Sequence, residues 1–271
     1  MEKNPVDKHQ IVTSNSWASL RRHTDARIGL GRSGISQPTA PQLAFQQAHA
    51  RARDAVHIPL DVKQLKTELM EAGLQSLLLH SQAEDRATYL QRPDKGRRLD
   101  ADSAALLKQV REQQPASDAT IVIADGLSST AVQRHATRVA AEVDQRLSAE
   151  GLTRTPVCIV QQGRVAVGDE VGELLGSRVV ILLVGERPGL SSPDSLGIYY
   201  TYNPHVGLTD AARNCISNIR PAGISPEDAA DRLLWLVMES LKRKLSGVDL
   251  KDESGDAEAL DGEGRRNFLL E

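Results

Sequence analysis

Val179-Val-Ile-Leu-Leu-Val-Gly185 is a run of six apolar residues that ends at a glycine. An uninterrupted apolar run of this length, rich in β-branched side chains, is typical of a strand buried on both faces of a parallel sheet. Thr120-Ile-Val-Ile-Ala124 and Val157-Cys-Ile-Val160 have the same character. The sequence therefore predicts three buried strands, and these strands decide the fold class.

Helical patterns separate the predicted strands. Ser128 or Ser129 is suited to cap a helix that ends at Gly151, because a hydroxyl accepts hydrogen bonds from the free amides of a first turn. A shorter helix from Asp169 to Leu175 follows the second strand. Helices between buried strands imply right-handed crossovers, so we expect a doubly wound parallel-sheet, Rossmann-like α/β domain.

The remaining chain is divided around this domain. We predict a disordered arm over residues 1–16, a smaller helical N-terminal region over residues 17–116, the α/β domain over residues 117–248 and an acidic flexible tail over residues 249–271. Apolar spacing predicts helices near residues 41–55, 62–69 and 103–111. Ser225-Pro-Glu-Asp228 combines a capping hydroxyl, a first-turn proline and acidic residues, and predicts the start of a last long helix.

The composition argues against several classes of function. The formal net charge is −3 and aromatic residues make up 3% of the chain, so a nucleic-acid-binding surface of cations and stacking rings is not expected. The sequence contains no apolar run of about 18 residues, the length that a membrane-spanning helix needs. Cys158 and Cys215 form neither a disulfide framework nor a zinc motif, which favours the reducing cytoplasm.

Turns containing glycine follow all three predicted strands, at Asp125-Gly126, at Gly163-Arg-Val165 and at Gly185–Gly189. The carboxyl ends of parallel strands share one edge of a sheet, and ligands of open α/β sheets bind there. We therefore expect these turns to form one rim, which a large ligand can approach closely because glycine has no side chain. The alternative is that they are ordinary strand-to-helix connections, which every such domain contains.

Motifs for independent catalysis are missing from the sequence. It has no dinucleotide fingerprint, no phosphate-binding loop, no Gly-x-Ser-x-Gly elbow and no histidines at metal-ligand spacing. Cys215 has no adjacent base, which favours a packing residue over a nucleophile. Arg97 and Arg98 are suited to an anion or to a partner's acidic surface, although a solvated pair is the more common arrangement. We predict no catalytic residue and no metal ligand.

Several blocks of the chain, taken in order, resemble the small subunit of ethanolamine ammonia-lyase. The resemblance extends from about Trp17 to Gly247, whereas the arm before it and the tail after Leu250 match no block of the family. The blocks are Tyr89-Leu-Gln-Arg-Pro-Asp-Lys-Gly-Arg-Arg-Leu99, Asp125-Gly-Leu-Ser128, Gly163-Arg-Val165, Gly172-Glu-Leu-Leu-Gly176, Val179-Val-Ile-Leu-Leu-Val-Gly-Glu-Arg-Pro-Gly-Leu190 and Cys215-Ile-Ser-Asn-Ile219.

The resemblance implies one component of a carbon–nitrogen lyase that converts ethanolamine to acetaldehyde and ammonia by radical chemistry. In this family a large TIM-barrel subunit holds the substrate, and the small subunit covers part of adenosylcobalamin in the cleft between them. The assembly is a trimer of paired heterodimers, and the cofactor carries the difficult step. The resemblance therefore implies that this chain is active only together with its large subunit.

By the same resemblance, Val165, Glu186 and Cys215 contact the cobalamin. Val165 and Glu186 also lie on the predicted rim, whereas Cys215 rests on the resemblance alone, as a contact residue with an unreactive thiol. Cobalamin proteins that place a histidine on cobalt use an Asp-x-His-x-x-Gly motif, which this sequence does not contain. We therefore expect the cofactor to keep its own base on the metal, with no protein histidine as ligand.

Two other interpretations remain at this point. The chain could be a stand-alone α/β nucleotide-binding or regulatory protein, or a scaffold that has lost cobalamin. The missing phosphate motifs and the ordered blocks count against the first, and the presence of Val165, Glu186 and Cys215 counts against the second. The expected location is the cytoplasm. The family often works inside a bacterial microcompartment, but Glu2 to Ser16 lacks an amphipathic pattern, so the sequence leaves encapsulation open.

Overall fold

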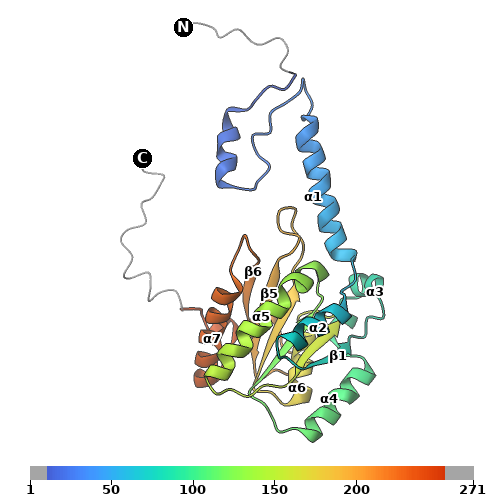
Figure 1. Cartoon of the computed structure of the whole chain (residues 1–271), viewed down its shortest axis with the longest axis vertical. Helices are drawn as coiled ribbons and strands as arrows, with labels where there is room; N and C mark the ends of the chain where they lie inside the picture. The colour runs from blue at the N-terminus through green and yellow to red at the C-terminus, as the bar shows by residue number, and fades with distance from the viewer. Residues whose placement is uncertain (1–10, 254–271) are drawn as a thin grey trace.

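A six-stranded sheet forms the centre of the computed structural model, which describes residues 11–253 (Figure 1). The first four strands in sheet order are parallel to one another, and each of the last two pairs antiparallel with the strand before it. In sheet order the strands are β1 (Ser76–His80), β3 (Val157–Gln161), β2 (Ala119–Ala124), β4 (Val179–Gly185), β5 (Leu196–Tyr202) and β6 (Arg213–Ile219).

The three predicted strands are confirmed as β2, β3 and β4, and they are mutually parallel neighbours at the middle of the sheet. Strands β1, β5 and β6 were not predicted from the sequence. Strand β1 lies inside the region expected to be helical. It was missed because its apolar run is so short that periodicity does not distinguish a strand from a helix. The sheet therefore takes one strand from residues before position 117.

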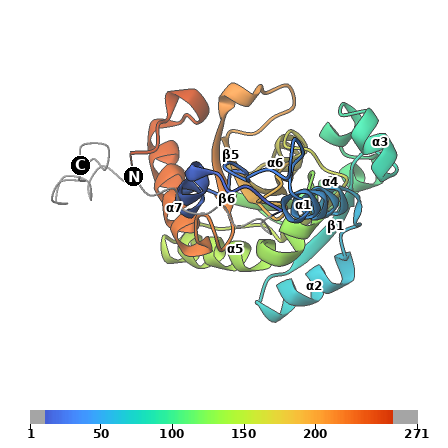
Figure 2. The same cartoon turned by 90° about the horizontal axis from the view of Figure 1, so that it is seen from above.

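Helices cover both faces of this sheet, which confirms the doubly wound α/β fold (Figure 2). Alternate residues of β4 show the two layers, since Ile181 packs in one core cluster and Leu182 in the other. One face is covered by α2 (Val62–Glu71), α5 (Ser129–Ala149) and α7 (Pro226–Arg243), and the other by α4 (Ala101–Gln113) and α6 (Val167–Leu175).

The predicted helix ends agree with the observed caps. The hydroxyl of Ser128 accepts a hydrogen bond from the amide of Ala131 at 3.1 Å, so Ser128 and not Ser129 caps α5. Ser225 caps α7 in the same way, with Pro226 as the first helical residue. Both helices therefore begin where the sequence indicated.

The N-terminal part of the described chain stands away from the sheet (Figure 1). It contains the 3₁₀ helix η1 (Ser16–His23) and the long helix α1 (Thr39–His57), of which only Ala55 is buried. The remaining elements are α3 (Arg86–Gln91) and the 3₁₀ turns η2 (Lys95–Arg97), η3 (Asp210–Ala212) and η4 (Gly247–Asp249).

Most of the predicted arm and tail lies outside the described residues. Within residues 11–16, Thr13 exchanges two backbone hydrogen bonds with Arg32. At the other end, Leu250 is buried in the core. Across residues 11–253, no helix has both the length and the hydropathy needed to cross a bilayer.

Candidate functional site

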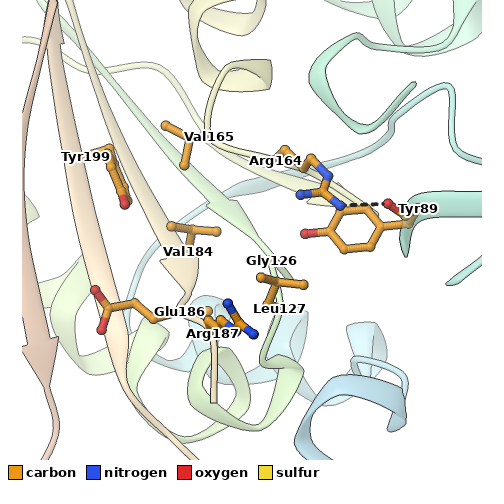
Figure 3. A pocket seen from close by; sticks show the side chains of 10 residues that line it. Tyr89, Gly126, Leu127, Arg164, Val165, Val184, Glu186, Arg187 and Tyr199 are labelled. Carbon is orange, nitrogen blue, oxygen red and sulfur yellow. Dashed lines mark hydrogen bonds between the residues drawn. The ribbon is translucent and has the colours of Figure 1, made fainter. Parts of the chain in front are cut away.

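A cavity of about 440 Å³ opens at the carboxyl ends of β2, β3 and β4 (Figure 3). The chain leaves β2 toward α5 on one face of the sheet and leaves β3 toward α6 on the other. Such a divergence of connections creates the crevice in which open α/β sheets bind ligands. The lining residues are Tyr89, Gly126, Leu127, Arg164, Val165, Val184, Gly185, Glu186, Arg187 and Tyr199.

The three predicted turns therefore do form one rim, because each contributes residues to this cavity. Gly126 follows β2, Val165 follows β3 and Glu186 follows β4. Gly126 has a φ of +58°, and a Cβ atom there would lie 2.3 Å from the carbonyl oxygen of Gly185. Only glycine fits this close approach of two strand ends, which keeps the floor of the cavity open.

Asp125 holds the turn after β3 in place. The residue is 5% exposed, and its two carboxylate oxygens accept hydrogen bonds from the backbone amides of Gln162 and Gly163, each at 3.0 Å. Gln162 has a φ of +54°, a conformation that needs outside support. Burial raises the pKa of Asp125, while the two amides and the nearby Arg86 guanidinium lower it. Asp125 thus acts inside the protein and positions the loop that carries Val165.

Tyr89 lies between two arginine side chains at one side of the cavity. The guanidinium carbons of Arg86 and Arg164 are each 4.5 Å from the centre of its ring. Arg164 also donates a hydrogen bond to the Tyr89 carbonyl at 2.9 Å, while its buried Nε has no partner. Burial raises the pKa of Tyr89 to about 12, so its hydroxyl stays protonated. This stack gives the cavity a rigid wall.

Arg86 connects that wall to the long N-terminal helix. It donates to the carbonyl oxygen of Val56, near the end of α1, at 2.6 Å, and to that of Gly126 at 2.8 Å. Its Nη1 is also 4.0 Å from a carboxylate oxygen of Asp125. Helix α1 therefore joins the domain at the same edge of the sheet as the cavity.

Glu186 lies at the other side of the cavity and ties three strands together. Its carboxylate accepts hydrogen bonds from the Ser195 hydroxyl, just before β5, and from the backbone amide of Asn218 in β6 at 3.2 Å. Gly197 leaves room for it, because a Cβ atom there would be 2.9 Å from Glu186 Oε1. Glu186 is thus both a lining residue and a positioning residue.

Cys215 is exposed on β6 and lies directly opposite Tyr199 of β5. Tyr199 lines the cavity and Cys215 does not, so Cys215 lies one strand beyond the lining, whereas Val165 and Glu186 belong to it. Partial desolvation raises the pKa of the Cys215 thiol, although its hydrogen bond with Tyr199 lowers it. Desolvation also raises the pKa of Tyr199 to about 12. The thiol is therefore mainly protonated at neutral pH, which is unlike an activated nucleophile.

Arg164 and Arg187 stand in two of the predicted rim turns but were not named as site residues, and Tyr89 and Tyr199 were not placed at the rim. The first three stand inside quoted sequence blocks, but no local pattern shows that their side chains meet. Tyr199 belongs to the unpredicted strand β5, whose run of Tyr and Thr residues was the available signal. Arg98 pairs with Glu170 through two hydrogen bonds of 3.0 and 2.9 Å, and Arg97 is exposed.

Comparison with known proteins gives a consistent result over nearly the whole chain. The family described as ethanolamine ammonia-lyase light chain matches residues 14–251. A protein of Ralstonia nicotianae named ethanolamine ammonia-lyase small subunit is 57% identical over 98% of each chain. A protein with the same name from Pseudomonas fluorescens is 54% identical over 100% of this chain and 98% of its own. Another, from Azotobacter vinelandii, is 57% identical over 96% of this chain and 97% of its own.

Proposed function

The chain belongs to the ethanolamine ammonia-lyase light-chain family, and we propose that its cavity binds part of adenosylcobalamin at the interface with the large subunit. It is a subunit of a carbon–nitrogen lyase. The observation that carries the proposal is that Val165 and Glu186, which resemblance assigns to cobalamin, line one cavity at the ligand-binding edge of the sheet. Cys215 adjoins that cavity through Tyr199.

The composition of the cavity suits one edge of a corrin ring. Its volume of about 440 Å³ falls within the range of ligand pockets and holds a part of such a large cofactor rather than all of it. Leu127, Val165 and Val184 supply apolar surface against a macrocycle. The Glu186 carboxylate supplies an acceptor for a corrin side-chain amide.

Each named residue then has a separate task. Val165 packs against the ring, and Asp125 fixes its loop through the amides of Gln162 and Gly163. Glu186 accepts an amide hydrogen bond and holds the strand that bears Cys215 close to the site. When bound, adenosylcobalamin supplies the radical that starts conversion of ethanolamine to acetaldehyde and ammonia. This chain orients the cofactor, and the large subunit holds the substrate.

The exposed N-terminal segment supports an interface beside the cavity. Several large apolar side chains of residues 17–45 are exposed along one projecting segment, and apolar surface that gathers in this way favours contact with a partner. They include Trp17, Ile35, Leu43 and Phe45. Because Arg86 links α1 to Gly126, a large subunit that covers this segment would also stand over the cavity. We propose the large TIM-barrel subunit as that partner, in a trimer of paired heterodimers.

The location follows the same proposal. Cys158 and Cys215 are both free thiols, which agrees with a reducing compartment such as the cytoplasm. Encapsulation in a bacterial microcompartment is a separate prediction, and the segment from Glu2 that bears on it lies mainly outside the described residues.

The direct test is an activity assay with ethanolamine and adenosylcobalamin. We expect acetaldehyde only when this chain is mixed with its cognate large subunit, because no catalytic group is proposed for the small subunit. Each subunit alone serves as the control, and size-exclusion chromatography verifies assembly of the mixture. No product from a mixture that assembles would contradict the proposed function.

Replacing Glu186 by alanine tests the cofactor site itself. We expect about tenfold weaker cobalamin binding to the assembled enzyme, because a hydrogen-bonding carboxylate at the cavity is lost. Subunit assembly should be unaffected. The matched control is Glu239→Ala, which removes a carboxylate from α7, a helix that contributes no residue to the cavity lining. Unchanged cobalamin affinity in the Glu186 variant, measured by spectroscopic titration, would remove Glu186 from the site.

A further inference from the structure

The two sides of the cavity carry different charges (Figure 3). Two guanidinium groups, those of Arg164 and Arg187, and one carboxylate, that of Glu186, are the ionised groups among the lining residues. In Figure 3 the charged ends of Glu186 and Arg187 point in opposite directions, and Arg164 lies across the cavity from Glu186. The cavity lining as a whole thus carries a net charge of one positive unit, and both of its guanidinium groups lie away from the Glu186 carboxylate.

Glu186 does not neutralise either arginine. Its Oε2 atom accepts the hydrogen bonds from the Ser195 hydroxyl and the Asn218 amide. Among the ion pairs within residues 11–253, none joins Glu186 to Arg164 or to Arg187. The two guanidinium groups therefore keep their full charge toward the cavity.

Arg164 is already held in a defined position. It stacks on the Tyr89 ring and donates one hydrogen bond to the Tyr89 carbonyl, and the Gly96 carbonyl accepts its backbone amide at 2.8 Å. Its Nε is buried and has no partner among the described residues. A guanidinium that is fixed in this way loses little further entropy when it binds a ligand oxygen.

Arg187 has the opposite character. It is exposed at the mouth of the cavity, and none of the side-chain hydrogen bonds or ion pairs within residues 11–253 involves its guanidinium. It follows Glu186 directly and precedes Pro188, whose ring limits the backbone of this short loop. Both guanidinium groups line one cavity, so an anion bound there would be attracted by both.

We propose that Arg164 and Arg187 form a subsite for a singly charged phosphate diester. Guanidinium groups match phosphate oxygens through paired donors, and one net positive charge matches one phosphodiester. This inference rests on the proposed function, and there it assigns the subsite to the phosphodiester that links the corrin of cobalamin to its nucleotide. The Glu186 side of the cavity then faces the amides of the ring, and the arginine side faces the nucleotide loop.

The test compares two corrinoids on the assembled complex of both full-length subunits. Cyanocobalamin contains the phosphodiester, whereas dicyanocobinamide lacks it together with the nucleotide. For Arg187→Gln we expect about tenfold weaker binding of cyanocobalamin and less than about a twofold change for cobinamide, measured by absorbance titration. The loss for cyanocobalamin should diminish as sodium chloride screens the wild-type interaction.

The matched control is Arg138→Gln, which removes the same charge from the exposed surface of α5 on the other face of the sheet. It should leave the affinity for both corrinoids unchanged. Arg164→Lys keeps the charge but loses the planar stack on Tyr89, so it should weaken cyanocobalamin binding several-fold while cobinamide binds normally.

The outcomes separate the subsite from the function on which it rests. If wild-type complex binds both corrinoids and Arg187→Gln weakens both equally, or neither, the phosphodiester subsite is wrong while the proposed function stands. If the wild-type complex binds neither corrinoid, the proposed function is wrong and the subsite falls with it.

Discussion

Replacing Gly185 by alanine is expected to lower the free energy of unfolding by about 3 kcal/mol and to abolish tight cobalamin binding. A Cβ atom at this position would lie 2.0 Å from the carbonyl oxygen of Ser128 and 2.7 Å from that of Asp125. Both are backbone atoms, so no side-chain rotation can relieve the contact. Moving them would separate β4 from the start of α5 and deform the floor of the cavity.

The stability effect is measured by chemical denaturation of the isolated chain, and the binding effect by titration of the complex. Gly168→Ala is the matched control, since its Cβ would meet nothing closer than 3.5 Å and the residue lies within α6. Alanine is favoured over glycine inside a helix by up to about 1 kcal/mol, so this control should be neutral or stabilising. Equal unfolding midpoints for the two variants would contradict the proposed close packing at Gly185.

Replacing Asp125 by alanine is expected to cost about 3 kcal/mol of stability and to loosen the loop that carries Val165. The change leaves the amides of Gln162 and Gly163 without their acceptor in a buried place. It also removes the carboxylate beside Arg86, and the side chain of this arginine is only 17% exposed. Buried donors without acceptors carry the full cost of their lost hydration, so the loop should rearrange.

Asp118→Ala provides the comparison for this prediction. Asp118 also accepts a backbone amide, that of Thr153, and pairs with Arg178, but it stands just before β2 at the opposite edge of the sheet. We expect a smaller stability loss there and unchanged cobalamin affinity. Amide hydrogen exchange at Gly163 reports the loop directly. Normal protection of that amide in Asp125→Ala would contradict the positioning role.

The expected effects differ because the residues contribute to the cavity in different ways. Gly185 and Asp125 shape the cavity through backbone contacts, so their loss affects both stability and binding. Arg187 is exposed, and its replacement should affect binding alone. A difference of this kind separates the residues that form the cavity from those that recognise its ligand.

Much of the architecture could be predicted from local patterns. The buried runs at β2, β3 and β4 identified a parallel sheet, and Ser225 with Pro226 located the start of α7. The rim could also be predicted, because strand direction alone places the turns after parallel strands at one edge. These features depend on periodicity and capping, which act over one or two turns of chain.

The sequence by itself therefore determined the fold class, the edge of the sheet where the cavity opens and, through resemblance, the family. Only the tertiary structure decided that Asp125 turns inward to hold Gly163, and that Tyr199 lies opposite Cys215. It alone placed Arg164 against Tyr89, 75 residues earlier in the chain. The physical reason is that such neighbours depend on strand order, register and packing between distant segments, which no local periodicity encodes.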